Sequence, residues 1–207
     1  MTDELAPDRA PAPGEGARRE RRGPAKARSR NRWALEWLLV IVVALAGAYA
    51  IKTFLVQAFV IPSGSMQPTL KIGDRVLVSK LNYRFGEVQR GDIVVFHNPT
   101  PRAEQGRDDF PQLIKRVIGL PGDVLQATAP DYRVKVNGVA LEEAYLGPGV
   151  RTRELESPVE VPPGHVFVMG DNRANSRDSR FIGPIEENDI IGEAFLRIWP
   201  LNRFGRP

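Results

Sequence analysis

The feature that most limits how this chain can fold is an apolar segment close to its N-terminus. From Trp37 to Ile51 the sequence runs for 15 residues without a charged side chain, fewer than the roughly 20 that a helix needs to cross a bilayer. Glu36 and Lys52 flank this run with side chains long enough to reach the headgroups, and Trp33 suits an interfacial position. Counted from Trp33 to Lys52, the segment has 20 residues, which is enough for one transmembrane helix.

Two other interpretations of this segment compete with a retained anchor. A buried core helix would also be apolar, but eight basic residues lie between Arg18 and Arg32, directly before the segment. A cleaved secretory signal peptide has the same order of basic, apolar and small-residue regions, the last of them here at residues 48–50. We expect a retained anchor with an extension over residues 33–60, because the preceding stretch is long for a signal peptide and apolar character resumes at Phe54. The positive-inside bias then keeps the N-terminus in the cytoplasm and the bulk of the chain on the far side.

Charge is distributed unevenly along the chain. Residues 1–32 carry nine basic and five acidic side chains, and the remaining residues balance at 20 of each sign. A domain that binds nucleic acid usually has a basic excess of its own, so the charge predicts no nucleic-acid partner. Residues 1–32 have too few large apolar side chains to bury a core, and we expect them to form a disordered basic cytoplasmic tail. The chain has no cysteine, which excludes disulfides, thiolate nucleophiles and cysteine-bound zinc.

Residues 61–207 are predicted to form a mainly β domain. Short apolar runs of strand length recur there, several of them after a Gly-Asp pair typical of a turn, and no stretch of useful length has helical periodicity. Asn137-Gly138 after a short apolar run predicts a two-residue hairpin. We expect residues 98–111 to form an extended loop or projecting hairpin, and about residues 125–163 to form an inserted subdomain. The predicted strands are Arg75–Val78, Asp92–Phe96, Leu113–Ile118, Arg133–Val136, His165–Met169 and Ile190–Trp199.

The first candidate nucleophiles are the serines of the tripeptide Ser63-Gly64-Ser65, shortly after the apolar segment. A serine needs a base to act as a nucleophile at neutral pH, and this tripeptide lacks the Gly-x-Ser-x-Gly pattern of α/β-hydrolases. His97 and His165 could each complete a Ser-His-Asp arrangement. Both histidines also fit the ends of surface strands, which is the commoner role.

The acidic residues near the C-terminal part of the domain do not suggest a metal site. Asp171 and Asp178 lie among Arg173, Arg177 and Arg180, whose charges oppose cation binding and favour internal ion pairs. Two isolated histidines also make a weak metal site. We therefore expect no metal and no cofactor.

Lys115 is the other candidate base. With the period of two of a strand, it shares one face with Leu113 and Val117, while Arg116 shares the other face with residues 114 and 118. Neither face is polar, so both charges should be desolvated or paired. A lysine that acts as a base near pH 7 to 8 needs a pKa about 2 to 3 units below 10.4, which burial can provide, whereas a guanidinium does not lose its proton. At this point an edge strand from which Lys115 extends to solvent remains an equal alternative.

Four longer motifs occur along the chain: PSGSMQPTL at residues 62–70, GDIVVF at 91–96, IKRVIGLPGD at 114–123 and MGDNRANSRDSR at 169–180. In their order and spacing they resemble the motifs of bacterial type I signal peptidases. The resemblance spans roughly residues 35–200 and implies a membrane-anchored Ser/Lys endopeptidase. It also implies the fold: a signal-peptidase-like β domain, mainly β, with an inserted β subdomain and one N-terminal transmembrane helix before it.

The resemblance implies catalytic or supporting roles for three serines and one lysine. Ser65 is similar to the family's nucleophile, and Lys115 to the neutral general base. The Ser63 hydroxyl would join the Ser65 backbone N–H in an oxyanion hole. Ser176, in the last motif, would hydrogen-bond to the lysine amine and orient it.

The rest of the last motif is implied to support the site. Asp178 and Arg180 resemble a supporting salt bridge, and residues 170–173 would shape the same wall. Ala174 departs from the family, which often has an acidic residue there. We expect this departure to affect support or specificity rather than the chemistry.

The resemblance also implies partners and a location. The substrates would be signal peptides of exported preproteins, bound as an added strand with small pockets for Ala at the first and third positions before the cut. The second partner would be the lipid bilayer, with a single-pass protein in the bacterial cell membrane and the catalytic domain of residues 61–207 outside the cytoplasm.

Two different function classes remain as alternatives. A self-cleaving repressor-like protein, which the resemblance suggests as a distant Ser/Lys relative, would need a DNA-binding helical domain upstream, where this sequence has the apolar segment. A non-enzymatic membrane-tethered β domain would bind partners through the insertion, with the serine and lysine merely structural.

Overall fold

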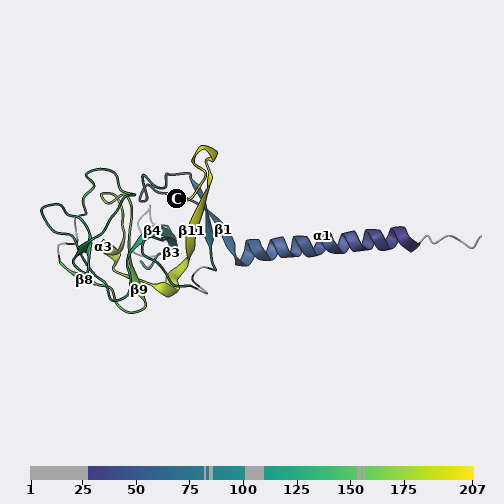
Figure 1. Ribbon diagram of the computed structural model, residues 1–207, viewed down its shortest axis with the longest axis horizontal. Helices are drawn as coiled ribbons and strands as arrows, with labels where there is room; N and C mark the ends of the chain where they lie inside the picture. Colours follow the sequence, from purple (N-terminus) through teal and green to yellow (C-terminus); the bar gives the residue numbers. More distant parts are fainter. Residues whose placement is uncertain (1–27, 82, 84–85, 101–109, 153–154, 156) are drawn as a thin grey trace, which may run out of the picture. The chain divides into compact units, whose positions relative to one another are not determined.

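The computed structural model describes residues 28–81, 83, 86–100, 110–152, 155 and 157–207 (Figure 1). The chain forms two units, residues 1–45 and residues 46–207. Most of the predicted disordered tail, residues 1–27, lies outside the described residues, as do residues 101–109 of the predicted loop. Among the described residues, one helix is long and apolar enough to cross a membrane, with its most apolar window at Arg32–Tyr49.

The helix α1 spans Arg28–Phe54 and begins and ends earlier than the sequence predicted. It includes residues 28–32, which were expected to belong to the tail, and it excludes residues 56–60, which were expected to extend the anchor. Those residues form the strand β1, Val56–Val60, instead. Their β-branched and aromatic side chains favour a strand, and the backbone pairs with the strand β2, Arg75–Ser79.

The β domain is built on one large antiparallel sheet, as the prediction of a mainly β fold requires. Its seven strands among the described residues follow the order β1-β2-β11-β3-β4-β9-β10, and every pair in it is antiparallel. The predicted apolar runs account for most of these strands. Besides β1 and β2, the members are β3 (Ile93–His97), β4 (Gln112–Gly119), β9 (His165–Met169), β10 (Ile185–Glu186) and β11 (Ile190–Trp199).

A smaller sheet of four described strands lies between β4 and β9 in the sequence, over nearly the same residues as the predicted insertion. Its order is β7-β6-β5-β8, and its strands are β5 (Val124–Gln126), β6 (Lys135–Val136), β7 (Val139–Ala140) and β8 (Val159–Glu160). The Asn137-Gly138 turn joins β6 to β7, and both turn residues have positive φ, 53° and 82°. This is the conformation of a type I′ hairpin, so the turn prediction is confirmed.

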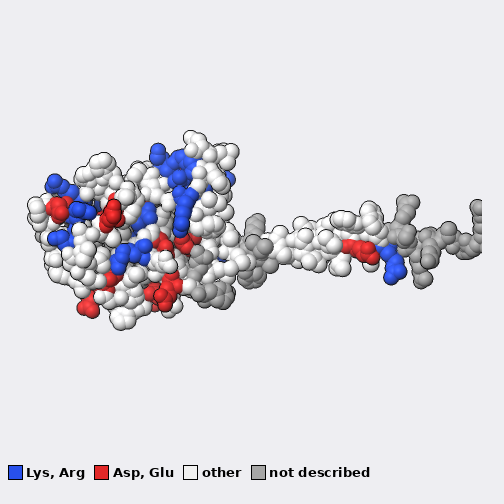
Figure 2. Space-filling view, viewed as in Figure 1, with Lys and Arg blue, Asp and Glu red and all other residues white. Residues whose placement is uncertain are grey.

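Short helices complete the domain. Among the described residues they include α3 (Ser179–Ile182) at the end of the last motif, the 3-10 helix η1 (Glu187–Asp189) before β11, and the 3-10 helix η2 (Leu201–Arg203) after it. Figure 2 shows basic and acidic side chains mixed on the visible face of the β domain. This mixture agrees with the balanced charge of residues 33–207 and differs from the basic face of a typical nucleic-acid-binding domain.

The strand β4 connects three hydrophobic clusters of the described residues. Ile114 belongs to the cluster that also holds Met66 and Leu70 from the serine motif. Val117 packs in a second cluster with β3 and β9, and Ile118 packs in a third with the small sheet. The serine-bearing loop and the lysine-bearing strand are therefore packed into the same hydrophobic cluster.

Candidate functional site

Ser65 lies in a loop, residues 62–74, that is closed at its base by backbone hydrogen bonds. Ile61 N donates to the Asp74 carbonyl at 2.9 Å, and Gly73 N donates to the Ile61 carbonyl at 2.9 Å. On both sides of the cis Gln67–Pro68 bond, side chains of the loop point into the core: Met66 and Leu70 are completely buried. Ser65 itself is 8% exposed, so its hydroxyl group lies at the edge of the core. The hydrogen bonds at the base of the loop fix the backbone of this segment.

Lys115 lies on the strand β4, one residue before the pairing of β4 with β9 begins. It pairs with Val94 of β3, and β9 pairs with β4 from Arg116 onward. The side chain is 3% exposed, which excludes the alternative of a lysine that extends to solvent. Its Nζ lies 2.8 Å from Ser65 Oγ and donates to the Ile114 carbonyl at 3.0 Å.

Burial gives the Lys115 amine the acid–base property that a neutral base needs. Loss of hydration lowers the pKa of Lys115 from 10.5 to about 8, although the carboxylates of Asp178 and Asp171 act in the opposite direction. In the ammonium form Nζ donates to Ser65 Oγ, whereas in the neutral form the same contact allows the hydroxyl to donate its proton to Nζ. The arrangement can therefore generate a nucleophilic serine.

The other side of the serine loop is held by the segment that follows β9. Asn172 N donates to the Ser65 carbonyl at 3.0 Å, and Asn172 Nδ2 donates to the Gly64 carbonyl at 3.1 Å. Ser63 Oγ lies 3.4 Å from Ser65 Oγ. From this position the Ser63 hydroxyl can rotate and donate a hydrogen bond to an oxygen atom of a group bound at Ser65 Oγ.

Asp178 and Arg180 form a buried ion pair with two parallel contacts. Arg180 Nε donates to Asp178 Oδ1 at 2.8 Å, and Arg180 Nη2 donates to Oδ2 at 2.9 Å. The same carboxylate accepts from Gly170 N at 2.9 Å and caps the N-terminus of α3. Because both charged side chains are almost fully buried, this pair fixes the segment between Gly170 and α3.

Ser176 is half-buried in that segment, and its Oγ is a buried atom with no hydrogen-bond partner within the described part of the chain. The hydrogen bond to the lysine amine that the resemblance implied is therefore not formed in this structure. Gly170 is the reason that the segment can come so close: an added Cβ would overlap Ser176 Oγ and the carbonyl of Ser65. A buried hydroxyl without a partner is costly, which marks this position as one where a ligand or a small shift would supply the missing bond.

Arg116 forms an ion pair with Asp171. The sequence predicted that the Arg116 charge is desolvated or paired, but it did not identify the partner. Arg116 Nε and Nη2 donate to Asp171 Oδ1 and Oδ2 at 2.9 and 2.8 Å, and the Arg116 guanidinium lies 4.0 Å from the ring centroid of Tyr145. Asp171 also accepts from the hydroxyl of Thr69 in the serine loop. This chain of contacts connects the serine loop, the lysine strand and the insertion.

Arg173 joins the insertion to the site in a second place. Its guanidinium pairs with Glu143 and donates to Thr152 Oγ1 at 2.6 Å, and its Nε donates to the Gly170 carbonyl at 3.1 Å. Sequence reasoning missed Thr69, Tyr145 and Glu143, because no local pattern pairs them with residues so distant in the chain.

Neither histidine takes part in the described contacts of Ser65. His97, at the exposed end of β3, pairs with Gln112 in the register, and His165 Nδ1 lies 3.0 Å from the Pro163 carbonyl. Among the described residues no group of three or more His, Cys, Asp or Glu side chains could hold a metal ion. The contacts of Ser65 thus favour lysine over histidine as its base.

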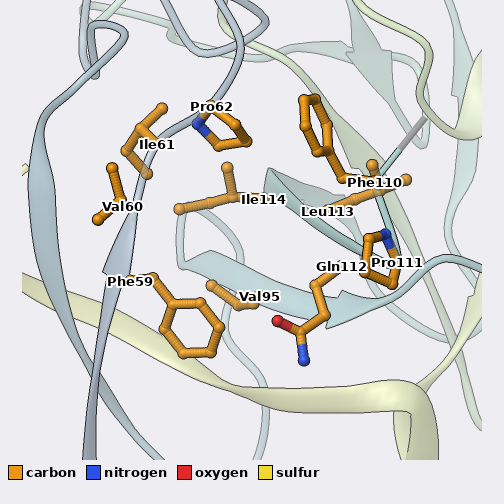
Figure 3. Close-up of a pocket in the computed structure, with 10 residues that line it drawn as sticks. All are labelled: Phe59, Val60, Ile61, Pro62, Val95, Phe110, Pro111, Gln112, Leu113 and Ile114. Carbon is orange, nitrogen blue, oxygen red and sulfur yellow. The ribbon is translucent and has the colours of Figure 1, made fainter. Parts of the chain in front are cut away.

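An apolar cavity of about 170 Å³ is lined by residues that neighbour the serine motif and Lys115 in the sequence (Figure 3). It is bordered by Pro62, which precedes Ser63, and by Ile114, which precedes Lys115. Three strands separate β1 from β4 in the sheet order, yet residues of both strands line the cavity, so the sheet is strongly curved. The lining residues are Phe59, Val60, Ile61, Pro62, Val95, Phe110, Pro111, Gln112, Leu113 and Ile114.

Two strand edges beside this cavity lack a partner strand among the described residues. The strand β1 pairs with β2 on one side alone. The strand β4 pairs with β9 from Arg116 onward, so residues 112–115 pair with β3 alone. An extended peptide laid in the cavity would find backbone donors and acceptors on both of its sides.

Comparison with known proteins gives consistent matches over most of the chain. The family model described as signal peptidase, peptidase S26, matches residues 34–199. Signal peptidase I of Leptolyngbya laminosa is 43% identical over 172 residues, covering 83% of this chain and 82% of that protein. Signal peptidase I of Mycobacterium tuberculosis is 35% identical and covers 82% of this chain and 74% of its own. A crystal structure of a signal peptidase I from Enterococcus faecalis is 31% identical, covers 52% of this chain and 96% of its own, and has a TM-score of 0.39.

Proposed function

The chain belongs to the signal peptidase family, peptidase S26, and we propose that it removes N-terminal signal peptides from exported preproteins with a Ser65–Lys115 dyad. The observation that carries this proposal is the 2.8 Å contact between Lys115 Nζ and Ser65 Oγ. Both side chains are buried, and the pKa of the amine is lowered to about 8. With this pKa, roughly one molecule in ten carries the neutral amine at pH 7 and about half do so at pH 8.

The proposed reaction proceeds by transfer of an acyl group to the serine. Neutral Lys115 takes the proton of Ser65 Oγ as this oxygen attacks the scissile carbonyl, and the resulting ammonium gives the proton to the leaving amine. The amide C–N bond breaks and an ester to Ser65 remains. Water then attacks this ester, with Lys115 taking its proton, which restores the hydroxyl and releases the carboxylate of the signal peptide.

The negative oxygen of each tetrahedral intermediate needs hydrogen-bond donors. The Ser65 backbone N–H and the Ser63 hydroxyl are the proposed donors, and removing one such donor typically costs about 3 kcal/mol of transition-state stabilisation. Ser176 is proposed to orient the Lys115 amine, and the unsatisfied Oγ next to Gly170 supports this role. The Asp178–Arg180 pair would support Ser176, because it fixes the segment that carries it.

The proposed substrate segment is an extended peptide that lies between β1 and the first half of β4. Two unpaired strand edges and an apolar cavity of about 170 Å³ support this placement. The apolar walls disfavour a charged side chain at a buried position. A small apolar residue such as Ala fits at the first and third positions before the cut, and we propose an Ala-x-Ala type site.

The proposed location is the bacterial cell membrane, with α1 as a single-pass anchor and the β domain outside the cytoplasm. The apolar window of α1 ends at Tyr49, and 16 residues lead from there to Ser65, a reach of at most about 55 Å for an extended chain. A preprotein presents its cleavage site just after its own apolar segment, at the same membrane face. Tethering then supplies a high effective concentration in place of tight binding.

Alanine variants test the dyad directly. Full-length Ser65→Ala and Lys115→Ala are expected to abolish cleavage of a preprotein with an Ala-x-Ala site in detergent, while both remain folded. Lys71→Ala, an exposed lysine of the same loop, is the matched control and should cleave at the wild-type rate, as should His165→Ala. Cleavage retained by either dyad variant would refute the dyad, and its loss in His165→Ala would favour the triad.

The anchor is tested separately by mass analysis of the membrane-bound protein. A retained anchor predicts a mature chain that contains residues 28–54. A mature N-terminus at Ile51 would show instead that the apolar segment is a cleaved signal peptide.

A further inference from the structure

The C-terminal segment contacts the serine loop at residues 68–74. After β11 the chain turns through η2, and Gly205 returns to pair with Arg197: Arg197 N donates to the Gly205 carbonyl at 2.8 Å. This return brings Arg203 beside the serine loop. Figure 2 shows basic side chains gathered near the end of β11 and the C-terminus.

Arg203 binds three acceptors of the serine loop at once. Its Nη1 donates to Asp74 Oδ2 at 2.7 Å, and its Nη2 donates to the carbonyls of Pro68 at 3.3 Å and Thr69 at 3.0 Å. Arg197 Nη1 adds a second bond to the Thr69 carbonyl at 2.8 Å. The planar fork of a guanidinium, with donors in fixed directions, is well suited to such a set of acceptors.

Thr69 is therefore held from both sides. Its carbonyl is bound by the C-terminal arginines, while its hydroxyl donates to Asp171, which pairs with Arg116 next to the lysine. Two turns connect Thr69 to the nucleophile: Leu70 N donates to the Met66 carbonyl at 2.8 Å, and Gln67 N donates to the Gly64 carbonyl at 3.1 Å. A shift at residues 68–69 would thus be transmitted to Ser65.

We propose that Arg203 is a positioning residue that holds the serine loop at the distance from Lys115 that proton transfer requires. The inference rests on the proposed function, since it concerns the same dyad. Release of the loop would move Ser65 Oγ from Nζ and admit water to the amine. The carboxylates of Asp178 and Asp171 raise the pKa of Lys115 and so favour the ammonium form, whereas burial lowers this pKa. Hydration of the amine would therefore raise the pKa and reduce the fraction of neutral lysine.

The test uses the full-length chain in detergent and a preprotein substrate, and it compares Arg203→Met with two matched controls. Arg206→Met removes an arginine of the same segment that is 84% exposed in its side chain and 3.9 Å from Glu193. Arg90→Met removes a partly buried ion pair with Asp123 on the side of the insertion. The readouts are kcat, KM, the melting temperature and the pH at which kcat/KM reaches half of its plateau.

Arg203→Met is expected to lower kcat by tenfold or more, toward the roughly hundredfold loss that a misplacement of about 1 Å can cause. Its KM should stay within about twofold of wild type, and the half-plateau pH should move upward. Arg90→Met should lower the melting temperature without moving that pH, and Arg206→Met should change neither. Arg203→Lys, which keeps the charge beside Asp74 but not the fork, should have an intermediate kcat.

A merely structural Arg203 would lower the melting temperature alone, and this result would overturn the inference. If Arg203→Met fails to fold, Arg203→Lys decides: a reduced kcat with a raised half-plateau pH supports the inference, and wild-type values overturn it. Ser65→Ala is measured in parallel. Cleavage by Ser65→Ala would refute the proposed dyad and the inference with it, whereas an inactive Ser65→Ala beside a fully active Arg203→Met would refute only the inference.

Discussion

Replacing the buried lysine by an apolar residue of similar length should make the domain more stable at neutral pH. Burial lowers the pKa of Lys115 from 10.5 to about 8, and each unit corresponds to about 1.4 kcal/mol. Between these two values the unfolded state binds more protons than the folded state, so the wild-type free energy of unfolding rises with pH through this window. Below pH 8 the buried ammonium therefore costs about 3 kcal/mol, and above pH 10.5 this cost has vanished.

Lys115→Met removes this cost at every pH. The variant also loses the contact with Ser65 Oγ, and this loss lowers its free energy of unfolding by about 1 kcal/mol. At pH 7 the variant should exceed wild type by about 2 kcal/mol in free energy of unfolding, or roughly 4 to 8 °C in melting temperature. This advantage should fall by about 3 kcal/mol between pH 7 and pH 10.5.

Urea denaturation of the full-length proteins in detergent at several pH values measures the difference, and effects of other titrating groups cancel between the two proteins. Lys71→Met, an exposed lysine, is the control and should show no pH-dependent difference from wild type. A difference between Lys115→Met and wild type that is constant from pH 7 to 10.5, or a less stable variant at pH 7, would refute the argument that burial depresses the pKa.

Three further outcomes are expected. The value of kcat/KM should rise through a pH of about 8 and level off above it, because the neutral amine of Lys115 accepts the proton; a profile that is flat from pH 6 to pH 9 would contradict the dyad. Gly170→Ala should lose cleavage about a hundredfold or more, because its Cβ would overlap the serine loop, whereas Gly147→Ala, whose Cβ would meet its nearest atom at 3.9 Å, should cleave normally. Asp171→Asn leaves the buried Arg116 guanidinium without a carboxylate and should lower the free energy of unfolding by about 3 kcal/mol; denaturation at the wild-type urea concentration would show that the pair contributes little.

The parts of the fold that depend on neighbouring residues could be predicted from the sequence. The alternation around Lys115 indicated a strand with no polar face, and the structure places that strand in the interior of the sheet. Asn137-Gly138 predicted a hairpin because both residues tolerate positive φ. The boundary at residues 56–60 was wrong because an apolar stretch after a helix can continue it or form a strand. Only pairing with β2 decides between the two.

The contacts that complete the site lie beyond such local reasoning. Thr69 and Asp171 are 102 residues apart in the sequence, and Thr69 and Arg203 are 134 residues apart. Any of several arginines could have paired with Asp171, and the sheet register alone selects Arg116. The motifs that resemble a known family indicated Ser65, Lys115, Asp178 and Arg180, while Thr69 and Arg203 acquire their importance only through the folded topology.

The burial of Lys115, the proposed base, explains how a lysine could serve where a histidine is more familiar. A histidine titrates near neutrality with little help, whereas a lysine must lose about 2 to 3 pKa units, and burial is the means of achieving this. A side chain directed to solvent would leave the amine hydrated, but the Lys115 side chain is 3% exposed even though this residue pairs with β3 alone. A base buried in this way needs a serine that is held beside it, and we propose that the closed loop provides this. The segment after β9 and the C-terminal arginines donate hydrogen bonds to that loop.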